Sequence, residues 1–412
     1  MPASPAVRSE ARPLLSLCLA TYNRAHYLER YLTHHLTAFE AAGIDYELVV
    51  SDNGSTDGTP KILADWAARH PRMRVMRQPR NLGAYPNILT TLREARGEFV
   101  VSIADDDLAV PHQLLAYVEA MAADPALCMV QAPWYLIDET QGDAITGKFY
   151  DFDGERRFGA GEYARCLAFL LEAHAFPECW IARRSALPSL AGPTPRFAYS
   201  FFVMLANALN QGDVLFSPEP HIAATAVAKG ANAHVGNSEA MEAWDSYRGG
   251  LEWLTSCARQ FNPGVLPDAI TMGAAITGFV CERMVVAARL QAHARNWSDA
   301  YQILRRLHAY DVPLDMAVAP DDIARLAAVE TALVECAQRG ASEIVVADGV
   351  PDHVLERMNL PGGARVIRDG AVADSDPRRG YVVVGDPPPS MRAQDFACDV
   401  VPAMNRFPIF SN

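Results

Sequence analysis

The sequence lacks three features that would assign the chain to a specialised class. It has no stretch of about 18 uncharged apolar residues, because the longest candidate, 270–290, is interrupted by Glu282 and Arg283. It has no run of Lys or Arg, and 36 basic against 49 acidic side chains give a net charge of −13. A polyanion such as nucleic acid is therefore not expected as the main partner. The eight cysteines include no CxxC pair, so buried thiols in a reducing compartment are expected instead of a metal knuckle.

The composition is that of a globular protein with more than one domain. At about 150 residues per domain, 412 residues predict two or three domains. Apolar residues make up 50% and charged residues 21%, which excludes a disordered or fibrous chain. Residues 1–13 carry Arg8, Glu10 and Arg12 and no apolar core, so we expect no signal peptide. These features predict a cytoplasmic protein with no transmembrane segment.

Short apolar runs alternate with amphipathic stretches over the first hundred residues. The expected strands are 14–20, 46–51, 73–78 and 98–104, and the expected helices between them are 24–42, 60–70 and 87–95. This alternation is typical of βαβ units around a parallel sheet and predicts a doubly wound α/β layer. In such a layer, ligands bind beyond the carboxyl ends of the strands.

The strongest polar cluster is Asp105-Asp106-Asp107, directly after the last of these strands. Three adjacent carboxylates repel one another, and a divalent cation with a preference for oxygen ligands, such as Mg²⁺ or Mn²⁺, would offset the repulsion. The alternative is a solvated turn ahead of the expected helix 111–123, whose N-terminus favours acidic side chains.

Three further polar turns follow expected strands. In VVSDNGSTDGT, residues 49–59, Asp52 could accept a hydrogen bond from a base or a ribose, and Gly54 would allow close approach of the backbone. Ordinary turn chemistry would explain the same residues. The other two turns are Thr21 to Arg24, with polar groups suited to a nucleotide, and Arg80 to Gly83.

Four segments, LCLATYNRAHYLERYL, ELVVSDNGSTDGT, RNLGAYPNI and GEFVVSIADDD, occur in this order within a stretch that runs from Leu14 to about Glu119. They resemble the successive motifs of family 2 glycosyltransferases with the GT-A fold. The resemblance implies that Asp105 and Asp107 form a DxD pair that meets the ribose and binds a metal ion on the diphosphate. It also implies a binding site for a nucleoside-diphosphate sugar formed by Thr21, Tyr22, Asn23, Arg24, Asp52, Asn53, Asn81, Gly83, Asp105 and Asp106.

The reaction implied by the resemblance is a single inverting displacement at the sugar C1 by an acceptor hydroxyl. Mn²⁺ or Mg²⁺ would be the cofactor, because a cation stabilises the departing nucleoside diphosphate. The acceptor would be a glycan, a lipid-linked glycan or a small molecule, in bacterial surface polysaccharide, glycoconjugate or natural-product synthesis.

The catalytic base is not identified by a motif. Family members commonly carry an acidic pair at the start of a helix near the acceptor, but Ser200 and Phe201 stand at that place here. Glu178 and His174 are the candidates in this half of the chain, since either could take a proton near neutral pH. The alternatives are a solvated loop carboxylate for Glu178 and a packed helix-end residue for His174.

The loop KGANAHVGN, residues 229–237, lies where many GT-A enzymes have a segment that closes on the diphosphate. His234 could be a third metal ligand and Lys229 a phosphate contact. The alternative is a loop without either role.

We expect three parts: a GT-A domain at 1–243 with a donor half at 14–125 and an acceptor half at 126–243, a helical segment at 244–341, and a small Rossmann-like α/β accessory module at 342–412. Unpaired strand edges in the module would have to be covered by another part of the protein or by a second chain, which favours a homodimer.

The rival functions are a sugar-phosphate nucleotidyltransferase and a catalytically silent scaffold that binds nucleotide sugars. The protein could also lie at the surface of the inner membrane.

Overall fold

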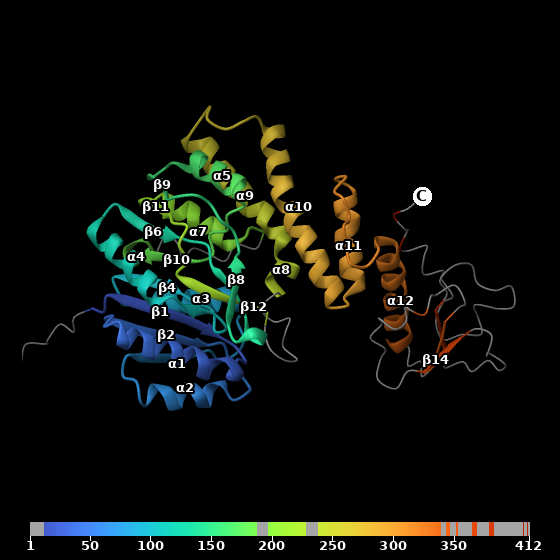
Figure 1. Cartoon of the computed structure of the whole chain (residues 1–412), viewed down its shortest axis with the longest axis horizontal. Coiled ribbons are helices and arrows are strands. Elements are labelled where there is room, and N and C mark those ends of the chain that lie inside the picture. The colour runs from blue at the N-terminus through green and yellow to red at the C-terminus, as the bar shows by residue number, and fades with distance from the viewer. Residues whose placement is uncertain are drawn as a thin grey trace, which may run out of the picture. The chain divides into compact units, whose positions relative to one another are not determined.

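The computed structural model describes residues 12–187, 197–227, 238–338, 343–346, 352, 365–368, 379–382, 407 and 410 (Figure 1). The chain divides into two compact units. The first comprises Met1–Gly236 with Asp245–Phe279, and the second comprises Asn237–Trp244 with Val280–Asn412. The expected domain bounds stay a prediction.

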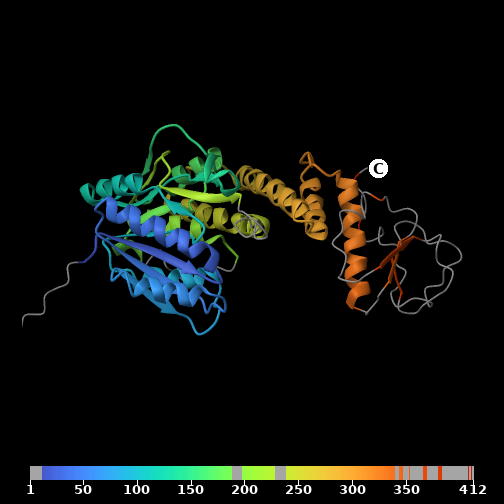
Figure 2. The same ribbon diagram turned by 60° about the horizontal axis from the view of Figure 1, so that its bottom comes forward.

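The N-terminal part of the first unit is the expected series of βαβ units. Its parallel strands are β1 (Leu15–Thr21), β2 (Tyr46–Asp52), β3 (Met73–Arg77) and β4 (Phe99–Ser102). The helices between them are α1 (Ala25–Ala41), α2 (Thr59–Ala67) and α3 (Ala84–Glu94). Figure 2 shows helices of this part above and below the sheet. The doubly wound arrangement is thereby confirmed.

The apolar patterning of the sequence explains these elements. Every residue of β2 is buried, as expected for a central strand covered on both faces. On α1 the buried side chains recur at helical spacing, so one stripe faces the sheet. They are Tyr27, Leu28, Tyr31, Leu32, His35, Leu36 and Phe39.

Four later strands complete the main sheet in the order β3-β2-β1-β4-β10-β6-β11-β9. They are β6 (Leu127–Gln131), β9 (Arg156–Phe158), β10 (Trp180–Arg183) and β11 (Asp213–Phe216). β10 runs antiparallel to both β4 and β6, which makes the sheet mixed. The helices of this part are α4 (Pro111–Ala123), α5 (Tyr163–Glu172) and α7 (Ser200–Leu209), with short 3-10 turns η1 (Glu139–Gln141) and η2 (Arg184–Ala186).

A second, four-stranded sheet has the order β5-β12-β7-β8. Its strands are β5 (Leu108–Ala109), β7 (Tyr135–Asp138), β8 (Ala144–Lys148) and β12 (Ile222–Val227). The sequence predicts a loop over 138–161, and this is wrong, because β8 and β9 lie there. β8 pairs with β7 across a turn in which Gly142 and Asp143 have positive φ. The strand conformation of β8 therefore depends on pairing with β7 and not on an apolar periodicity in its own sequence.

Helices dominate residues 238–338, which include most of the segment 244–341 expected to be helical. They are α8 (Ser238–Glu242), α9 (Trp244–Phe261), α10 (Ala269–His293), α11 (Trp297–His308) and α12 (Pro320–Gln338). Pro263 and Pro267 separate α9 from α10, but α10 ends without a proline, at a turn where Arg295 has a φ of 63°. A break of this kind leaves no proline signal in the sequence.

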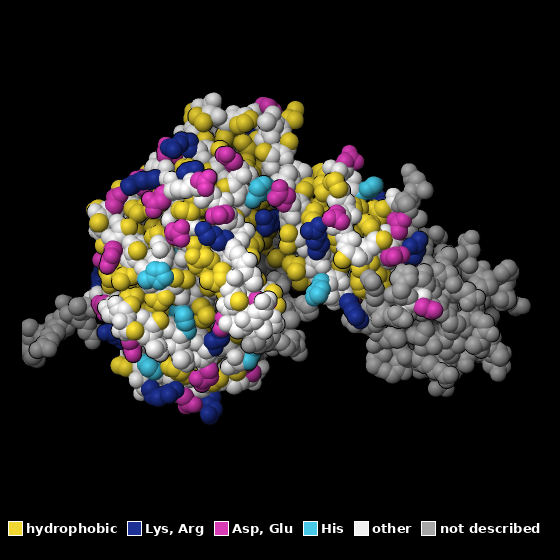
Figure 3. Space-filling model, in the orientation of Figure 1, with side chains coloured by type: hydrophobic (Ala, Val, Ile, Leu, Met, Phe, Trp, Pro, Cys, Tyr) yellow, Lys and Arg dark blue, Asp and Glu magenta, His cyan; other side chains and the backbone are white. Residues whose placement is uncertain are grey.

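α10 is the one helix in the described ranges that is long and apolar enough to cross a membrane, and 33% of its most apolar window is buried. The core helix of a soluble protein passes the same test, so the expected absence of a transmembrane segment stays a prediction. The tip of the α9–α10 hairpin exposes hydrophobic side chains (Figure 3), with Phe261, Val265 and Ile270 between 52% and 85% exposed.

The last three strands form a parallel sheet in the order β14-β13-β15. They are β13 (Glu343–Val346), β14 (Arg365–Arg368) and β15 (Arg379–Val382). The sequence predicts a strand in each of the segments EIVVADG, ARVIRDG and GYVVVGD, and each of these three strands overlaps one of them. The expected fold class is therefore confirmed: an α/β domain with a large mixed sheet is followed by a helical segment, and a small parallel sheet comes last.

Candidate active site

The site is built at the carboxyl ends of neighbouring strands. Thr21, the last residue of β1, lies in register with Asp52, the last residue of β2. β4 runs parallel on the other side of β1 and leads into the three aspartates. The Thr21 hydroxyl donates a hydrogen bond of 2.6 Å to Asp105 Oδ2. Clusters that are about 30 and 80 residues apart in sequence thus meet at one edge, as parallel pairing requires.

Asp105 is a buried carboxyl with a single cationic neighbour shown at ion-pair distance. Its side chain lies 3.3 Å from Arg24 Nε, and the residue is 6% exposed. Burial raises the pKa of Asp105 to about 7, Arg24 acts in the opposite direction, and the adjacent Asp106 adds to the rise. Arg24 Nη1 is buried with no hydrogen-bond partner among the described residues. An anionic group at this position would satisfy that nitrogen.

Asp107 is held from the second sheet. The backbone N–H of Thr225 on β12 donates to Asp107 Oδ1 over 3.1 Å, and the Thr225 hydroxyl donates to the backbone oxygen of Asp106 over 2.6 Å. Burial raises the pKa of the Asp107 carboxyl well above its usual range, and the charges of Asp106, Asp105 and Glu178 raise it further. Acidic groups are therefore crowded here, and the crowding favours the protonated form of Asp107.

The carboxylates of Asp105 and Asp107 are the groups that could hold a metal ion. No cluster of three or more His, Cys, Asp or Glu ligands occurs in the described part of the chain. Two carboxylates nevertheless suit Mg²⁺ or Mn²⁺, because such ions are commonly bound by one or two carboxylates with substrate phosphates and water. A cation would also relieve the repulsion that raises the pKa of Asp107.

Asp52 keeps one carboxylate oxygen without a hydrogen bond. Oδ1 accepts from the backbone N–H of Ser55 at 2.9 Å. Oδ2 lies 3.4 Å from Arg77 Nε but has no hydrogen-bond partner among the described residues, although Asp52 is 1% exposed. A buried acceptor of this kind is suited to an N–H group of a ligand.

Asn53 holds the turn that contains Asn81 and Gly83. Its Nδ2 donates to Asn81 Oδ1 at 2.9 Å and to the backbone oxygen of Gly83 at 3.1 Å. Its Oδ1 accepts from the backbone N–H of Leu82 at 2.9 Å. The hydrogen bonds of the Asn53 side chain therefore position the turn at residues 81–83. Asn81 and Gly83 are exposed on the surface of this turn.

Asn23 joins the first turn to the second. Its φ is 53°, its Oδ1 accepts from the backbone N–H of Thr56 at 2.8 Å, and its own N–H donates to the Ser55 hydroxyl at 2.9 Å. The neighbouring Tyr22 is 39% exposed, so its ring is accessible to a ligand. A Cβ on Gly54 would lie 2.8 Å from the backbone of Arg80, which explains the glycine at this contact.

The structure separates the two candidate bases. Glu178 accepts a hydrogen bond of 2.7 Å from the Tyr199 hydroxyl and lies close enough to Asp107 to raise its pKa. His174 follows the end of α5 with a φ of 46°, and its ring stacks on Phe279 of α10 with centroids 5.5 Å apart. Glu178 thus joins the aspartates, whereas His174 packs against a helix. His234 and Lys229 lie outside the described residues.

Sequence reasoning missed two residues that support the cluster. Thr225 stands 118 residues after Asp107, and nothing in its sequence context marks it. Tyr199 directly precedes α7, where the sequence resemblance leads one to look for an acidic pair. Glu178, which precedes β10, brings a carboxylate to this helix end through its hydrogen bond with Tyr199.

The family comparison decides the assignment. The model of the family described as glycosyl transferase family 2 matches residues 16–190. This part of the chain belongs to glycosyl transferase family 2. The matched range contains every described residue of the candidate site except Thr225 and Tyr199. The resemblance on which the sequence analysis relied is confirmed.

Each of three curated relatives matches no more than a third of this chain. An abequosyltransferase of Salmonella typhimurium is 33% identical over 119 residues, which are 28% of this chain and 35% of the relative. A chondroitin synthase of Escherichia coli is 29% identical over 138 residues, which are 33% of this chain and 19% of the relative. An uncharacterised protein of Mycobacterium bovis is 32% identical over 96 residues, 23% of this chain. The chain spans 27% of the length of that protein.

Two solved structures resemble this chain in part. One is Staphylococcus aureus TarS 1-349 in complex with UDP-GlcNAc, with a TM-score of 0.48 and 14% identity, covering 79% of this chain and 86% of that one. Another is a mannosyltransferase from Pyrobaculum calidifontis in complex with GDP-Man and Mn²⁺, with a TM-score of 0.42 and 19% identity, covering 73% and 85%.

The raised pKa of Asp105 predicts how stability depends on pH. Between about pH 4 and pH 7 the native state retains a proton that the unfolded chain has released, since a free aspartate titrates near 4. In metal-free buffer the free energy of unfolding should fall as the pH rises through this window. Urea denaturation at several pH values measures the slope.

Asp105→Asn should reduce that slope, and Asp65→Asn, at an exposed position of α2, should leave it unchanged. An unchanged slope in Asp105→Asn would show that Asp105 titrates near its usual value.

Proposed function

We propose that the protein is a glycosyltransferase that moves a sugar from a nucleoside-diphosphate sugar to an acceptor hydroxyl. The observation that carries the proposal is the meeting of Thr21, Asp52 and the three aspartates at adjacent strand ends of a family 2 domain. The names of the abequosyltransferase and the chondroitin synthase agree with a role in polysaccharide synthesis.

The donor binds across the strand ends. The free Oδ2 of Asp52 accepts a hydrogen bond from an N–H group of the base, and Tyr22 offers a ring face beside it. Thr21, Asn23, Arg24, Asn53, Asn81 and Gly83 form or position the surrounding surface. Asp105 and Asp106 lie toward the ribose. Asp105 and Asp107 would hold Mn²⁺ or Mg²⁺, which supplies Lewis-acid stabilisation of the departing diphosphate, and His234 is a further candidate ligand.

Glu178 is the catalytic base in this proposal. Its carboxylate takes the proton of the acceptor hydroxyl, whose oxygen attacks the sugar C1 from the face opposite the diphosphate, so the anomeric configuration inverts. The Tyr199 hydroxyl orients the carboxylate and stabilises its charged form. His174 is the weaker candidate, because its stacking on Phe279 gives it a packing role.

The small sheet and the α9–α10 hairpin have proposed roles outside the chemistry of sugar transfer. The small sheet has two outer strands, β14 and β15, each with a neighbour on one side only in the described part of the chain. We place the protein in the cytoplasm as a homodimer in which these edges are covered, with the module as an accessory element. The exposed apolar tip of the α9–α10 hairpin is consistent with contact at the inner membrane surface.

Loss of the Asp107 carboxylate should abolish most of the activity. Asp107→Asn should lower turnover by at least about a hundredfold, because one electrostatic contact to the leaving group is lost. A transfer assay with Mn²⁺ and a panel of UDP, GDP, CDP and dTDP sugars measures this. Activity of the wild-type protein should disappear in excess chelator and return with Mn²⁺. Full activity in chelator would exclude metal dependence.

Replacement of the proposed base should separate binding from chemistry. Glu178→Gln should reduce turnover by at least about a hundredfold while donor affinity measured by calorimetry stays within about twofold. Tyr199→Phe should cause a smaller loss and move the acidic limb of the kcat/KM profile to higher pH, because the carboxylate loses a stabilising donor.

His174→Asn, which tolerates a positive φ, serves as the competing variant. A large loss in His174→Asn with an active Glu178→Gln would assign the base to His174. A wild-type protein that binds the donors but neither transfers nor hydrolyses any of them would favour the silent scaffold.

Sedimentation equilibrium tests the homodimer. The full-length chain should give a mass of about twice 45.0 kDa at micromolar concentration, because covered sheet edges require a partner. A mass of one chain over the whole concentration range would contradict the proposal.

A further inference from the structure

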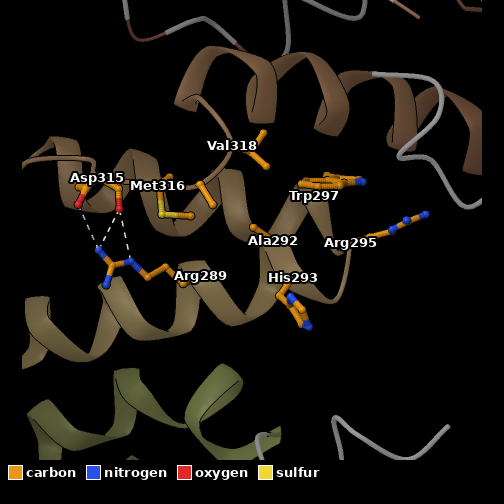
Figure 4. A pocket seen from close by; sticks show the side chains of 9 residues that line it. Arg289, Ala292, His293, Arg295, Trp297, Asp315, Met316 and Val318 are labelled. Carbon is orange, nitrogen blue, oxygen red and sulfur yellow. Dashed lines mark hydrogen bonds and ion pairs between the residues drawn. The ribbon is translucent and has the colours of Figure 1, made fainter. Parts of the chain in front are cut away.

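All the residues that line one cavity belong to the second compact unit. This cavity lies where α10 ends and α11 begins, beside the segment 315–318 that leads to α12, and has a volume of about 550 Å³ (Figure 4). Ligand cavities in proteins commonly have volumes of this order. Its walls combine the basic side chains Arg289, His293 and Arg295 with the apolar surface of Trp297, Met316 and Val318.

The polar groups of this cavity are mainly hydrogen-bond donors. Trp297 is 2% exposed, and its Nε1–H is buried with no hydrogen-bond partner in the described part of the chain. In Figure 4 the nitrogen edge of its indole points to the same side as the Arg295 guanidinium. Indole and guanidinium groups donate and do not accept, so a ligand that satisfies them must be an acceptor. A buried donor without a partner costs free energy, and that cost is recovered when an acceptor binds.

Arg289 and Arg295 differ in the hydrogen bonds and ion pairs that their side chains form. Arg289 donates to the backbone oxygen of Asp315 at 3.0 and 3.3 Å and lies 3.8 Å from its carboxylate, so the only acid in the wall is already paired. Arg295 has no ion pair or hydrogen bond from its side chain among the residues that the structure describes. The Arg295 guanidinium therefore remains able to bind an anion.

The backbone at Arg295 is unusual for this residue type. Its N–H donates to Ala292 O, and the next N–H, of Asn296, donates to Gln291 O, which ends α10 with a left-handed residue. Glycine or asparagine commonly occupies this position, because a Cβ is disfavoured at positive φ. An arginine therefore occupies a position in the cavity wall where the backbone would prefer another residue.

We propose that this cavity binds an oxyanion joined to an apolar group. The oxyanion, a phosphate or a carboxylate, accepts from Arg295 and from Trp297 Nε1–H, and the apolar group lies against Met316 and Val318. The proposal does not rest on the transferase activity, since no residue of this cavity belongs to the candidate active site.

Calorimetry with the full-length chain tests the site. The probes are octyl phosphate and octanoate below their micelle concentrations, with octyl glucoside as the neutral analogue and inorganic phosphate as the analogue without an apolar group. We expect one octyl phosphate or one octanoate per chain, with the tighter of the two identifying the oxyanion. Both control compounds should bind at least about tenfold more weakly. Equal binding of octyl glucoside, or no binding of either anionic probe, would overturn the proposal.

Arg295→Asn removes the charge and fits the left-handed backbone. It should weaken binding of the preferred anionic probe at least about tenfold while the melting temperature stays the same or rises. Trp297→Phe keeps a ring in the wall but removes the N–H, and should also weaken binding. Lys61→Ala, which removes an exposed cation of α2, should have no effect. Unchanged affinity in both Arg295→Asn and Trp297→Phe would assign the probes to another part of the protein.

Discussion

The candidate site depends on the burial of one carboxyl group. Asp105 is held by the Thr21 hydroxyl on one side and by the Arg24 guanidinium on the other, and both come from the end of β1 and the turn after it. Burial without full compensation raises the pKa of Asp105 to about 7. A site in this condition gains free energy when a cation or a polar ligand arrives, which is the physical basis for reading it as a binding site.

The turns around Asp105 are fixed before any ligand binds. Asn23 joins the first turn to the second, and Asn53 joins the second to the turn at 81–83. These amide side chains use their hydrogen bonds on backbone groups or on one another, so their contribution is to hold other groups in place. Asp52 Oδ2 and Arg24 Nη1, which have no hydrogen-bond partner among the described residues, remain to bind a ligand.

A further acidic group, Glu178, reaches the aspartates from an element other than α7. No acid occupies the start of α7, but Tyr199 at that helix end binds Glu178, which precedes β10. β10 lies antiparallel beside β4, and this pairing carries Glu178 toward the aspartates. One acidic group can therefore serve the same region from a different element, which sequence motifs do not report.

The sequence alone determined the elements whose formation depends on local patterning. Apolar runs and helical stripes specified β1 to β4 and their helices, and parallel pairing then required Thr21, Asp52 and Asp105 to meet. Only the tertiary structure decided what depends on distant partners. β8 forms because β7 pairs with it, Thr225 supports Asp107 from 118 residues away, and Glu178 approaches the aspartates while His174 packs on Phe279. Such contacts arise from long-range packing, and no local periodicity encodes them.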